Sequence, residues 1–381
     1  MSAAPAGPLA QAVRPDGPLV IGLMYPEDYE ARPRQELDDD LAALRALDPA
    51  IEIIEVRYVN SPELRTRRGS SPGADLRHLA PVLTPAQRDA FSRVEVSLTL
   101  DLPFDVATVA PNLRWVQGLG AGVSQLLSAG LGEAGIRLTS AAGVNGVSIS
   151  EFVVARLLQI WKRLPEIDAS QSRHLWQPAY GREVAGSTLG VVGLGGIGRQ
   201  VARRGHGLAM VVLACRRSAA PGSTDPDVDT LFPPEELHEL LGRCDAVVAA
   251  VPETAETVGL FGPAEFAAMR PGSIFVNVGR GSAVDEEALV GALGSGHLRA
   301  AVIDVVVAEP LAEDSPLWDV PNLYISSHCS TSADRFFANL YALFRENVRR
   351  YLDGSPLINE VEARMGPGSI PDRTPEPAPG A

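Results

Sequence analysis

Short apolar runs alternate with longer amphipathic stretches through most of the chain, from about residue 18 to residue 361. In the first part the runs predict strands near 18–24, 51–58, 94–100 and 113–117, with a helix near 36–47. In the second part they predict strands near 188–193, 210–215, 245–251, 273–278, 300–305 and 322–327. The runs "DAVVAAV" and "AAVIDVVV" are apolar at almost every position, which is typical of strands buried on both faces of a parallel sheet. The pattern therefore predicts an α/β protein with two doubly wound parallel sheets, the second of six strands.

Segments rich in Pro, Ala and Gly flank this alternating region. Residues 1–17 and 362–381 contain too few apolar side chains to bury, and we expect both to be disordered. Residues 62–87, rich in Pro, Arg and Ser, are expected to form a loop that interrupts the first domain. Two domains are expected, the first of them discontinuous: residues 18–149 with 332–361, and residues 150–331.

The charge balance excludes several classes of partner. The 381 residues include 33 Lys and Arg against 47 Asp and Glu, which gives a net charge of −14. A chain this acidic is not expected to bind nucleic acid or an anionic membrane surface. Lys162 is the only lysine, which excludes a Walker-type phosphate loop and argues against Schiff-base chemistry.

The cysteines and the start of the chain bear on the compartment. Cys215, Cys244 and Cys329 are odd in number and are not spaced as ligand pairs, so they predict small core residues rather than disulfides or a metal site. The first residues lack the basic and hydrophobic regions of a signal peptide, and no apolar run is long enough to span a bilayer. These features predict a cytoplasmic protein without a metal.

A glycine-rich turn joins a strand to a helix in "STLGVVGLGGIGRQVARR" (187–204). Gly193 permits the tight turn, Gly195 lets the backbone approach a pyrophosphate, and Gly198 lets helix and strand pack closely. The free N–H groups at the start of the helix can then bind phosphates. This motif alone is a weak signal, and an ordinary Gly-rich turn is the alternative. The strand before it, the helix after it and the strands that follow favour a dinucleotide-binding Rossmann unit.

The second strand of this unit ends in cations, at a position where an acid usually grips the adenosine ribose. The run "MVVLACRRS" (210–218) ends in Arg216, Arg217 and Ser218 and contains no carboxylate. Guanidinium groups match a 2′-phosphate in charge and geometry, so this segment favours NADP over NAD. The alternative is that both arginines are solvated at a strand end and that the cofactor is NAD.

Polar side chains follow three successive strands of the second part. Arg280 follows "SIFVNVG", Glu309 follows "AAVIDVVVA" and His328 follows "NLYISS". The carboxyl ends of parallel strands meet at one edge of a sheet, so we expect these side chains to share a cleft. There a cation could hold a substrate carboxylate, and an acid could orient an imidazole that moves a proton. Gly279 and Gly281 on either side of Arg280 suggest a ligand that approaches the backbone closely.

Each of these three residues also has an ordinary structural explanation. Arg280 could cap a helix, Glu309 could be a loop acid before a proline, and His328 could be solvated. The prediction depends on their occurring together at consecutive strand ends.

With these motifs the chain resembles the D-isomer-specific 2-hydroxyacid dehydrogenases, a family with lactate, glycerate, phosphoglycerate, hydroxypyruvate/glyoxylate, formate and phosphite enzymes. The likeness covers about residues 18–361, and the matching stretches are "SISEFVVARLL", "VGLGGIG", "VPETAET", "VNVGRGSAVDEEAL", "AAVIDVVVAEP" and "NLYISSH". The resemblance implies an enzyme that transfers a hydride between a nicotinamide dinucleotide and a small 2-oxo or D-2-hydroxy acid. It also implies a Rossmann domain, a smaller flavodoxin-like substrate domain, an active site in the cleft between them, and a homodimer.

The resemblance further implies roles for individual residues. Arg280 would hold the substrate carboxylate and polarise the 2-oxo group, while His328 would exchange the proton and Glu309 would orient His328. Asp304 resembles the acid that binds the nicotinamide carboxamide. Substrate contacts are expected at Ala121 and Gly122, through backbone N–H groups, and at Asn145. The remaining cofactor contacts are expected at Gly193, Gly195, Gly196, Ile197, Gly198, Val251, Pro252, Thr254 and Val278, together with the strand-end arginines and Ser218.

Two departures from family patterns narrow the substrate, and one alternative function stays open. Glu309 stands where a formate enzyme would have glutamine, and Ala121 stands where a phosphite enzyme would have lysine. The alternative is a dinucleotide-sensing or corepressor-like binding protein on the same fold. The complete set of Arg280, Glu309 and His328 favours an enzyme, because a sensor would not need it.

Overall fold

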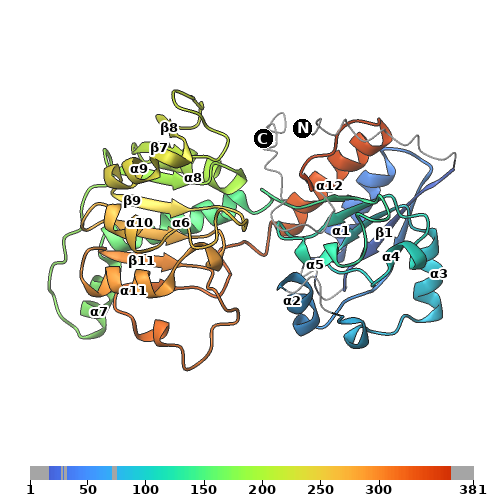
Figure 1. The fold of residues 1–381 in the computed structure, drawn as a ribbon, viewed down its shortest axis with the longest axis horizontal. Helices are drawn as coiled ribbons and strands as arrows, with labels where there is room; N and C mark the ends of the chain where they lie inside the picture. Colours follow the sequence, from blue (N-terminus) through green and yellow to red (C-terminus); the bar gives the residue numbers. More distant parts are fainter. Residues whose placement is uncertain (1–16, 27–28, 30–31, 71–74, 362–381) are drawn as a thin grey trace, which may run out of the picture. The chain divides into compact units, whose positions relative to one another are not determined.

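A computed structural model describes residues 17–26, 29, 32–70 and 75–361 of the chain (Figure 1). Apart from Gly17, the two ends predicted to be disordered lie outside these residues. The chain separates into two compact units. Unit 1 runs to Ala142 and resumes at Asp334, and unit 2 is Gly143–Ala333. The expected boundaries lay a few residues away, at 149/150 and 331/332.

Unit 2 is built on a parallel sheet of seven strands, in the order β12-β11-β10-β9-β6-β7-β8. Its strands are β6 Thr188–Val192, β7 Val211–Cys215, β8 Thr230–Phe232, β9 Ala246–Ala249, β10 Ile274–Asn277, β11 Ala300–Ile303 and β12 Leu323–Ile325. From β6 the chain builds outward to β8 and then returns to place β9 on the other side of β6. This reversal is the topological switch point at which doubly wound sheets bind ligands.

The prediction of six strands in this unit was wrong because the apolar pattern did not reveal β8. This strand has only three residues, "TLF", and Pro233 and Pro234 follow it directly. It pairs with β7 in parallel, and Leu231 and Phe232 are buried. A run this short, next to prolines, carries no periodicity that distinguishes it from a loop.

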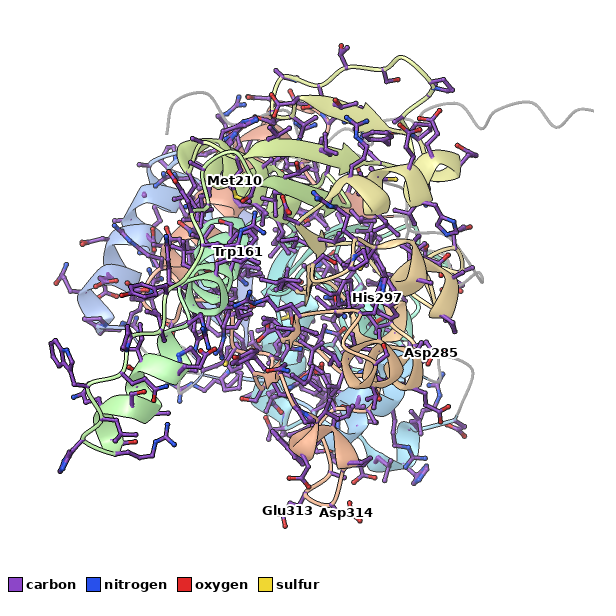
Figure 2. The ribbon with its side chains drawn as sticks, turned by 90° about the vertical axis from the view of Figure 1, so that its left-hand side faces the viewer. Trp161, Met210, Asp285, His297, Glu313 and Asp314 are labelled. Carbon is purple, nitrogen blue, oxygen red and sulfur yellow. The ribbon has the colours of Figure 1, made fainter. Side chains whose placement is uncertain are left out.

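Helices cover both faces of this sheet because neighbouring strand residues point to opposite sides. Val191 packs in a cluster with α6 and α8, whereas Val192 packs in another with α9, α10 and α11. These helices are α6 Gly146–Trp161, α8 Gly196–Gly207, α9 Leu237–Arg243, α10 Pro263–Ala268 and α11 Glu286–Gly294. Trp161 and Met210, labelled in Figure 2, belong to the cluster under α6 and α8. The unit is therefore a Rossmann-type layer of sheet between helices.

Shorter elements complete the unit. They are α7 Leu164–Ser172 and the 3-10 turns η3 Pro234–Glu236, η4 Gly281–Ala283 and η5 Pro316–Asp319. None of the helices in the described part of the chain has the length and apolar character that crossing a membrane requires.

Unit 1 contains the first sheet along the chain, with strands in the order β13-β5-β4-β3-β1-β2; the sheet of unit 2 is the second. Its strands are β1 Leu19–Met24, β2 Ile51–Glu55, β3 Val96–Thr99, β4 Trp115–Gly118, β5 Arg137–Thr139 and β13 Glu360–Val361. All pair in parallel except β13, which is antiparallel to β5. The order 2-1-3-4-5 of the parallel strands is that of flavodoxin-like sheets.

The helices of unit 1 include one from the C-terminal part of the chain. They are α1 Arg34–Arg45, α2 Pro62–Ser70, α3 Pro85–Arg93, α4 Val106–Val109, α5 Ser124–Leu127 and α12 Phe336–Leu352, with the 3-10 turn η2 Arg77–Leu79. On β4, the Trp115 ring lies 5.5 Å from that of Phe344 and 5.6 Å from that of Tyr351, both on α12. Asn347 of the same helix donates to the buried Gln117 side chain at 3.1 Å. The first sheet is thus completed by residues more than 200 positions away.

The segment 62–87 is not the continuous loop that its composition predicts, because α2 and the start of α3 occupy part of it. Arg68 on α2 is 1 % exposed. Its guanidinium donates to Ser128 Oγ at 2.7 Å and to the Leu102 carbonyl, and lies over the Phe104 ring. Burial lowers its pKa below the ordinary arginine value. Arg68 therefore anchors α2 to the rest of unit 1, in a segment that the sequence predicted to be a loop.

Candidate functional site

The carboxyl edge of the second sheet collects most of the predicted site residues. Because the strands are parallel, the segments that leave them lie along one edge. Gly193 follows β6, residues 251–254 follow β9, Arg280 follows β10, Asp304 follows β11 and His328 follows β12. Glu309 reaches the same place from the loop after β11, as its contact with His328 shows.

His328 and Glu309 form a hydrogen-bonded pair. The imidazole Nδ1 lies 2.9 Å from Oε2 of Glu309, and the two side chains are 52 % and 40 % exposed. An ionised carboxylate only accepts hydrogen bonds, so the imidazole donates from Nδ1 and leaves Nε2 for proton exchange. His328 has a left-handed backbone, with φ of 52°. This conformation is uncommon for a residue with a side chain, and it persists where the surrounding structure fixes the backbone.

Arg280 projects from a turn that Asn277 holds closed. The Asn277 amide donates to the Arg280 carbonyl at 2.9 Å and accepts from the Gly279 N–H at 3.1 Å. The Arg280 guanidinium is partly exposed and donates to the Gly279 carbonyl at 2.8 Å. Asn277, fully buried at the end of β10, is a positioning residue that the sequence did not single out.

The glycines beside Arg280 serve the fold itself, which corrects the interpretation that they admit a ligand. A Cβ atom on Gly281 would overlap the backbone of Val306, and one on Gly279 would lie 2.7 Å from the Val251 carbonyl oxygen. The Val306 N–H in turn donates to Glu309 at 3.3 Å. The missing side chains therefore allow the turn that carries Arg280 to pack directly on the loop that carries Glu309.

The glycine-rich turn has the geometry that the sequence suggests. Gly193 has a φ of +99°, and a Cβ on Gly198 would overlap the Gly193 carbonyl oxygen. Gly195, which precedes α8, faces open space. A Cβ on Gly196 would lie 2.7 Å from Gly143, while Ile197 packs against the core cluster. The start of α8 is therefore bare of side chains at Gly195 and open to a phosphate.

The residues expected beneath the cofactor occupy two kinds of position. Val251 and Val278 are core residues of the two clusters, and Pro252 is exposed. Thr254 is 8 % exposed, and its N–H donates to Thr257 Oγ1 at 2.8 Å. Asp304 is 2 % exposed and accepts hydrogen bonds from the turn around His328.

The strand-end arginines are less alike than the sequence suggests. Arg217 and Ser218 are exposed, but Arg216 pairs with Asp225 at 3.1 Å. Arg199, just after the glycine turn, donates to both oxygens of the same carboxylate at 2.9 Å. Burial alone would raise the pKa of Asp225, but bonds from Arg199 and the charges of both arginines lower it below its usual value. The sequence missed this carboxylate because it lies in the loop after β7.

Ala121 and Gly122 are exposed in the turn before α5, in unit 1. Neither N–H donates to a backbone group of the described residues. Their grouping with Arg280, which belongs to unit 2, stays a prediction. Asn145 precedes α6, and a Cβ on the adjoining Gly146 would lie 2.8 Å from the carbonyl oxygen of Gly196 in the glycine-rich turn.

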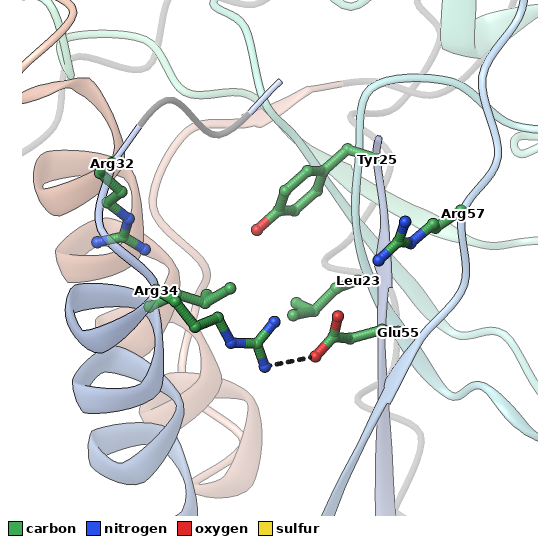
Figure 3. A pocket seen from close by; sticks show the side chains of 7 residues that line it. Leu23, Tyr25, Arg32, Arg34, Glu55 and Arg57 are labelled. Atoms are coloured by element: carbon green, nitrogen blue, oxygen red, sulfur yellow. Dashed lines mark hydrogen bonds and ion pairs between the residues drawn. The ribbon is translucent and has the colours of Figure 1, made fainter. Parts of the chain in front are cut away.

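A separate pocket of about 120 Å³ lies in unit 1 at the ends of β1 and β2 (Figure 3). Its lining is Leu23, Tyr25, Arg32, Arg34, Leu37, Glu55 and Arg57, none of which belongs to the predicted site. The Arg34 guanidinium pairs with Glu55 at 2.9 Å, and Arg32 pairs with Asp40 at 2.5 Å. Since acids already neutralise these cations, the pocket does not indicate an anion site. Across the described residues, no group of three or more His, Cys, Asp and Glu is arranged to hold a metal.

Comparison with known proteins assigns the architecture to a family. Residues 154–330 match the model described as D-isomer specific 2-hydroxyacid dehydrogenase, NAD binding domain. Glyoxylate/hydroxypyruvate reductase B of Klebsiella pneumoniae subsp. pneumoniae is 31% identical over 304 residues, covering 76% of this chain and 91% of that protein. The chain belongs to the D-isomer specific 2-hydroxyacid dehydrogenase family.

Other members of the family extend the comparison. D-3-phosphoglycerate dehydrogenase of Archaeoglobus fulgidus is 33% identical over 265 residues, which are 68% of this chain and 49% of that enzyme. The chain thus spans about half the length of the phosphoglycerate dehydrogenases it matches. The solved structure of a family member from Xanthobacter autotrophicus, in complex with NADPH and MES, is 26% identical with a TM-score of 0.68. That comparison covers 90% of this chain and 98% of the other.

The packing of Gly281 against Val306 gives a first test. Gly281→Ala should lower the free energy of unfolding by about 3 kcal/mol, because the added methyl group overlaps backbone that can only move as a segment. Gly291→Ala is the matched control: that glycine lies inside α11 and faces open space, so alanine should raise stability by about 0.5–1 kcal/mol. Urea denaturation measures both. Equal stability of Gly281→Ala and the parent would show that the two turns do not pack as tightly as described.

Proposed function

We propose that this member of the family reduces small 2-oxo acids to D-2-hydroxy acids with a nicotinamide dinucleotide, and catalyses the reverse oxidation. The observation that carries the proposal is the hydrogen-bonded pair of His328 and Glu309 at the carboxyl edge of a Rossmann-type sheet. An acid–imidazole pair at this edge is what proton transfer to a carbonyl oxygen requires. A binding protein that only senses a dinucleotide has no use for it.

The residues present fit such a cofactor. The start of α8 is open at Gly195, and cationic side chains end the second strand of the unit. When bound, the dinucleotide supplies or accepts the hydride. The chain itself must bind the carboxylate of the 2-oxo acid, polarise its carbonyl group and provide one proton.

His328 is the proton donor in the direction of reduction. Its Nδ1 stays bonded to Glu309 while Nε2 gives its proton to the oxygen of the former carbonyl group. The Glu309 carboxylate stabilises the imidazolium form before transfer and keeps the ring oriented. In oxidation the neutral Nε2 takes the hydroxyl proton back.

Arg280 is the substrate-binding cation. Its guanidinium is partly exposed and can therefore meet a ligand. Asn277 fixes the turn from which Arg280 projects, at the edge of the sheet. A guanidinium group can donate two parallel hydrogen bonds to a carboxylate, or one to the carboxylate and one to the adjacent carbonyl oxygen. Glyoxylate and hydroxypyruvate are the substrates we expect, because the reductase that is similar over most of its length carries those names.

The catalytic assignment is tested with a panel of 2-oxo acids, including glyoxylate, hydroxypyruvate, pyruvate and phenylpyruvate. His328→Gln should lower kcat on the best substrate by about 100-fold or more, because glutamine cannot donate a titratable proton. Dinucleotide binding, followed by fluorescence, should be nearly unchanged. His238→Gln is the matched control: this exposed histidine pairs with Glu265 at 2.9 Å on other helices, and its loss should leave kcat intact. Full activity of His328→Gln would refute the assignment.

We further propose that the enzyme prefers NADPH to NADH, and that Arg217 and Arg216 make different contributions. Arg217 is exposed and can move onto a 2′-phosphate. Arg216 is held in place by Asp225, so part of its charge is already neutralised but its position is fixed. Support comes from the cationic end of β7 and from the similar protein of known structure that binds NADPH.

Replacing both arginines by alanine should raise the KM for NADPH about tenfold or more and leave that for NADH almost unchanged, since charge-assisted bonds to phosphate contribute about 1.5–3 kcal/mol each. Arg203→Ala is the control, because Arg203 pairs with Asp227 at 3.0 Å in the same cluster but is not at the strand end. It should change neither KM by more than about twofold. Equal use of both cofactors by the parent protein would overturn the preference.

We also propose a homodimer, because one segment of unit 2 exposes several large hydrophobic side chains. Large side chains of α7 and the segment after it are exposed: Leu164, Ile167, Leu175, Trp176 and Tyr180. Trp176 and Tyr180 are 104 % and 85 % exposed. Monomeric proteins rarely leave such a group of residues in water, so a second copy of the chain is the occupant we propose.

Trp176→Ser combined with Tyr180→Ser should convert the dimer to a monomer, measured by light scattering after gel filtration. The loss of two large aromatic anchors removes the side chains that most often dominate an interface. Trp318→Ser serves as control, because Trp318 is 51 % exposed but lies outside this segment. If the parent chain is itself monomeric at micromolar concentration, the proposal is wrong.

A further inference from the structure

A carboxylate from the loop between β7 and β8 pairs with the first cation after β7. Asp225 Oδ2 accepts from Arg216 Nη1 at 3.1 Å and from Arg199 Nη2 at 2.9 Å, while Asp225 Oδ1 accepts from Arg199 Nη1 at 2.9 Å. The Asp225 side chain is 5 % exposed, whereas those of Arg216 and Arg199 are 20 % and 24 % exposed. The acid is thus almost covered, and each arginine keeps a part that a ligand can reach.

Asp225 is the group that holds the Arg216 side chain in place. Among the described residues, the bond from Nη1 to Asp225 is the one hydrogen bond that this guanidinium makes, and its buried Nε has no partner there. Arg199 is held more firmly, because Asp227 also accepts a bond from its Nη1 at 2.6 Å. A buried guanidinium without any acceptor is costly. Without Asp225 we therefore expect the Arg216 side chain to turn out into water.

The loop and the helix in turn fix Asp225. Its Oδ1 accepts from the Asp227 N–H at 3.1 Å, and its carbonyl accepts from the Val228 N–H at 3.3 Å. Arg199, which binds both carboxylate oxygens, lies in the first turn of α8, next to the glycine-rich turn. Asp225 therefore joins the start of α8 to the end of β7, the two places that a dinucleotide would contact with its pyrophosphate and its adenosine ribose.

The surroundings of Asp225 remain cationic although they contain two acids. The arginine–aspartate cluster consists of Arg199, Arg203, Arg216, Asp225 and Asp227. Burial alone would raise the pKa of Asp227, but bonds from Arg203 and Arg199 lower it below its usual value, so both acids of the cluster are ionised at neutral pH. Three arginines thus exceed two carboxylates, and the exposed Arg217 adds a further cation. A phosphate monoester carries a charge of about −1.5 to −2 at pH 7, so the end of β7 can attract one.

We propose that Asp225 is a positioning residue for cofactor choice: it holds the Arg216 guanidinium where a 2′-phosphate on the adenosine ribose would lie, and so contributes to a preference for NADPH. The proposal rests on the NADPH preference proposed above and adds a residue that acts through Arg216. An arginine that is already ordered loses less side-chain freedom when it binds a phosphate. The unphosphorylated ribose of NADH gains nothing from this order.

Three changes isolate the role of Asp225. Asp225→Asn keeps the shape of the side chain and removes the charge that holds Arg216. Asp227→Asn is the matched control, because it removes a carboxylate of the same loop that bonds to Arg199 and Arg203 and has no bond to Arg216. Arg216→Ala, with and without Asp225→Asn, shows whether the acid acts through this arginine.

The dissociation constants of NADPH and NADH are measured on the full chain by fluorescence, which needs no turnover. Asp225→Asn should raise the constant for NADPH about tenfold, or about 1.4 kcal/mol, and change that for NADH by less than about twofold. Asp227→Asn should change neither by more than about twofold. In the Arg216→Ala background, Asp225→Asn should add less than about twofold for either cofactor. A partly unfolded variant would weaken both cofactors by the same factor, so the ratio of the two constants remains a valid readout.

The opposite sign of the NADPH effect is the sharpest contrary outcome. Removing a negative charge by itself favours an anion. Unchanged or tighter NADPH binding by Asp225→Asn would therefore show that the charge of the acid outweighs its hold on Arg216, and would overturn the proposal. A tenfold loss that persists in the Arg216→Ala background would also overturn it, because Asp225 would then act independently of that arginine.

The same measurements separate this proposal from the proposed function. If the parent binds NADPH more tightly than NADH but reduces none of the 2-oxo acids, the proposed reaction fails and the role of Asp225 is still decided by the binding constants. If the parent binds both cofactors equally, the NADPH preference fails, and the role of Asp225 in that preference fails with it. If the parent is selective and Asp225→Asn is equally selective, the role of Asp225 alone is refuted.

Discussion

Backbone-to-backbone packing at the carboxyl edge of the second sheet is the constraint on which the candidate site depends. The turns that follow β6, β9, β10 and β11 lie side by side at that edge, and at each contact between them a glycine stands where a side chain would not fit. Gly193 lies against Ala250, Gly279 against Val251 and Gly281 against Val306. The turns therefore form a continuous row. A displacement of one turn is transmitted to the next, because protein interiors are close-packed.

This row explains how residues far apart in sequence reach one place. Arg280 lies between two glycines whose backbones meet the turn before it and the loop after it. That loop holds Glu309 through the Val306 N–H, and Glu309 bonds to His328. Three side chains would take part in the proposed reaction. Their relative positions are set by main-chain contacts and by two buried side chains, the amide of Asn277 and the carboxylate of Asp304.

The sequence predicted the elements that have a clear local pattern, and it missed those whose structure depends on tertiary contacts. Long apolar runs and the glycine-rich turn identified the strands next to the site, because burial on both faces leaves a continuous signal. The three residues of β8 carry no such signal. Helix α2 was read as a loop because residues 62–87 are rich in Pro, Arg and Ser, and only the contacts of Arg68 with Ser128 and Leu102 show that this helix packs on the unit. Asp225 and Asn277 were missed for the same reason: their roles lie in the groups they meet, which no local pattern records.

The return of the chain to its first sheet has a consequence for how the molecule is made. Unit 2 is one uninterrupted segment, Gly143–Ala333, whereas unit 1 needs α12 and β13. During synthesis the strands β1 to β5 leave the ribosome before unit 2, but Trp115 lacks its partners Phe344 and Tyr351 until α12 has also emerged. The N-terminal unit is therefore the last to close, after the segment that follows it has had time to fold. Until then the side of the sheet that carries Trp115 is the part of the nascent chain to which we expect a chaperone to bind.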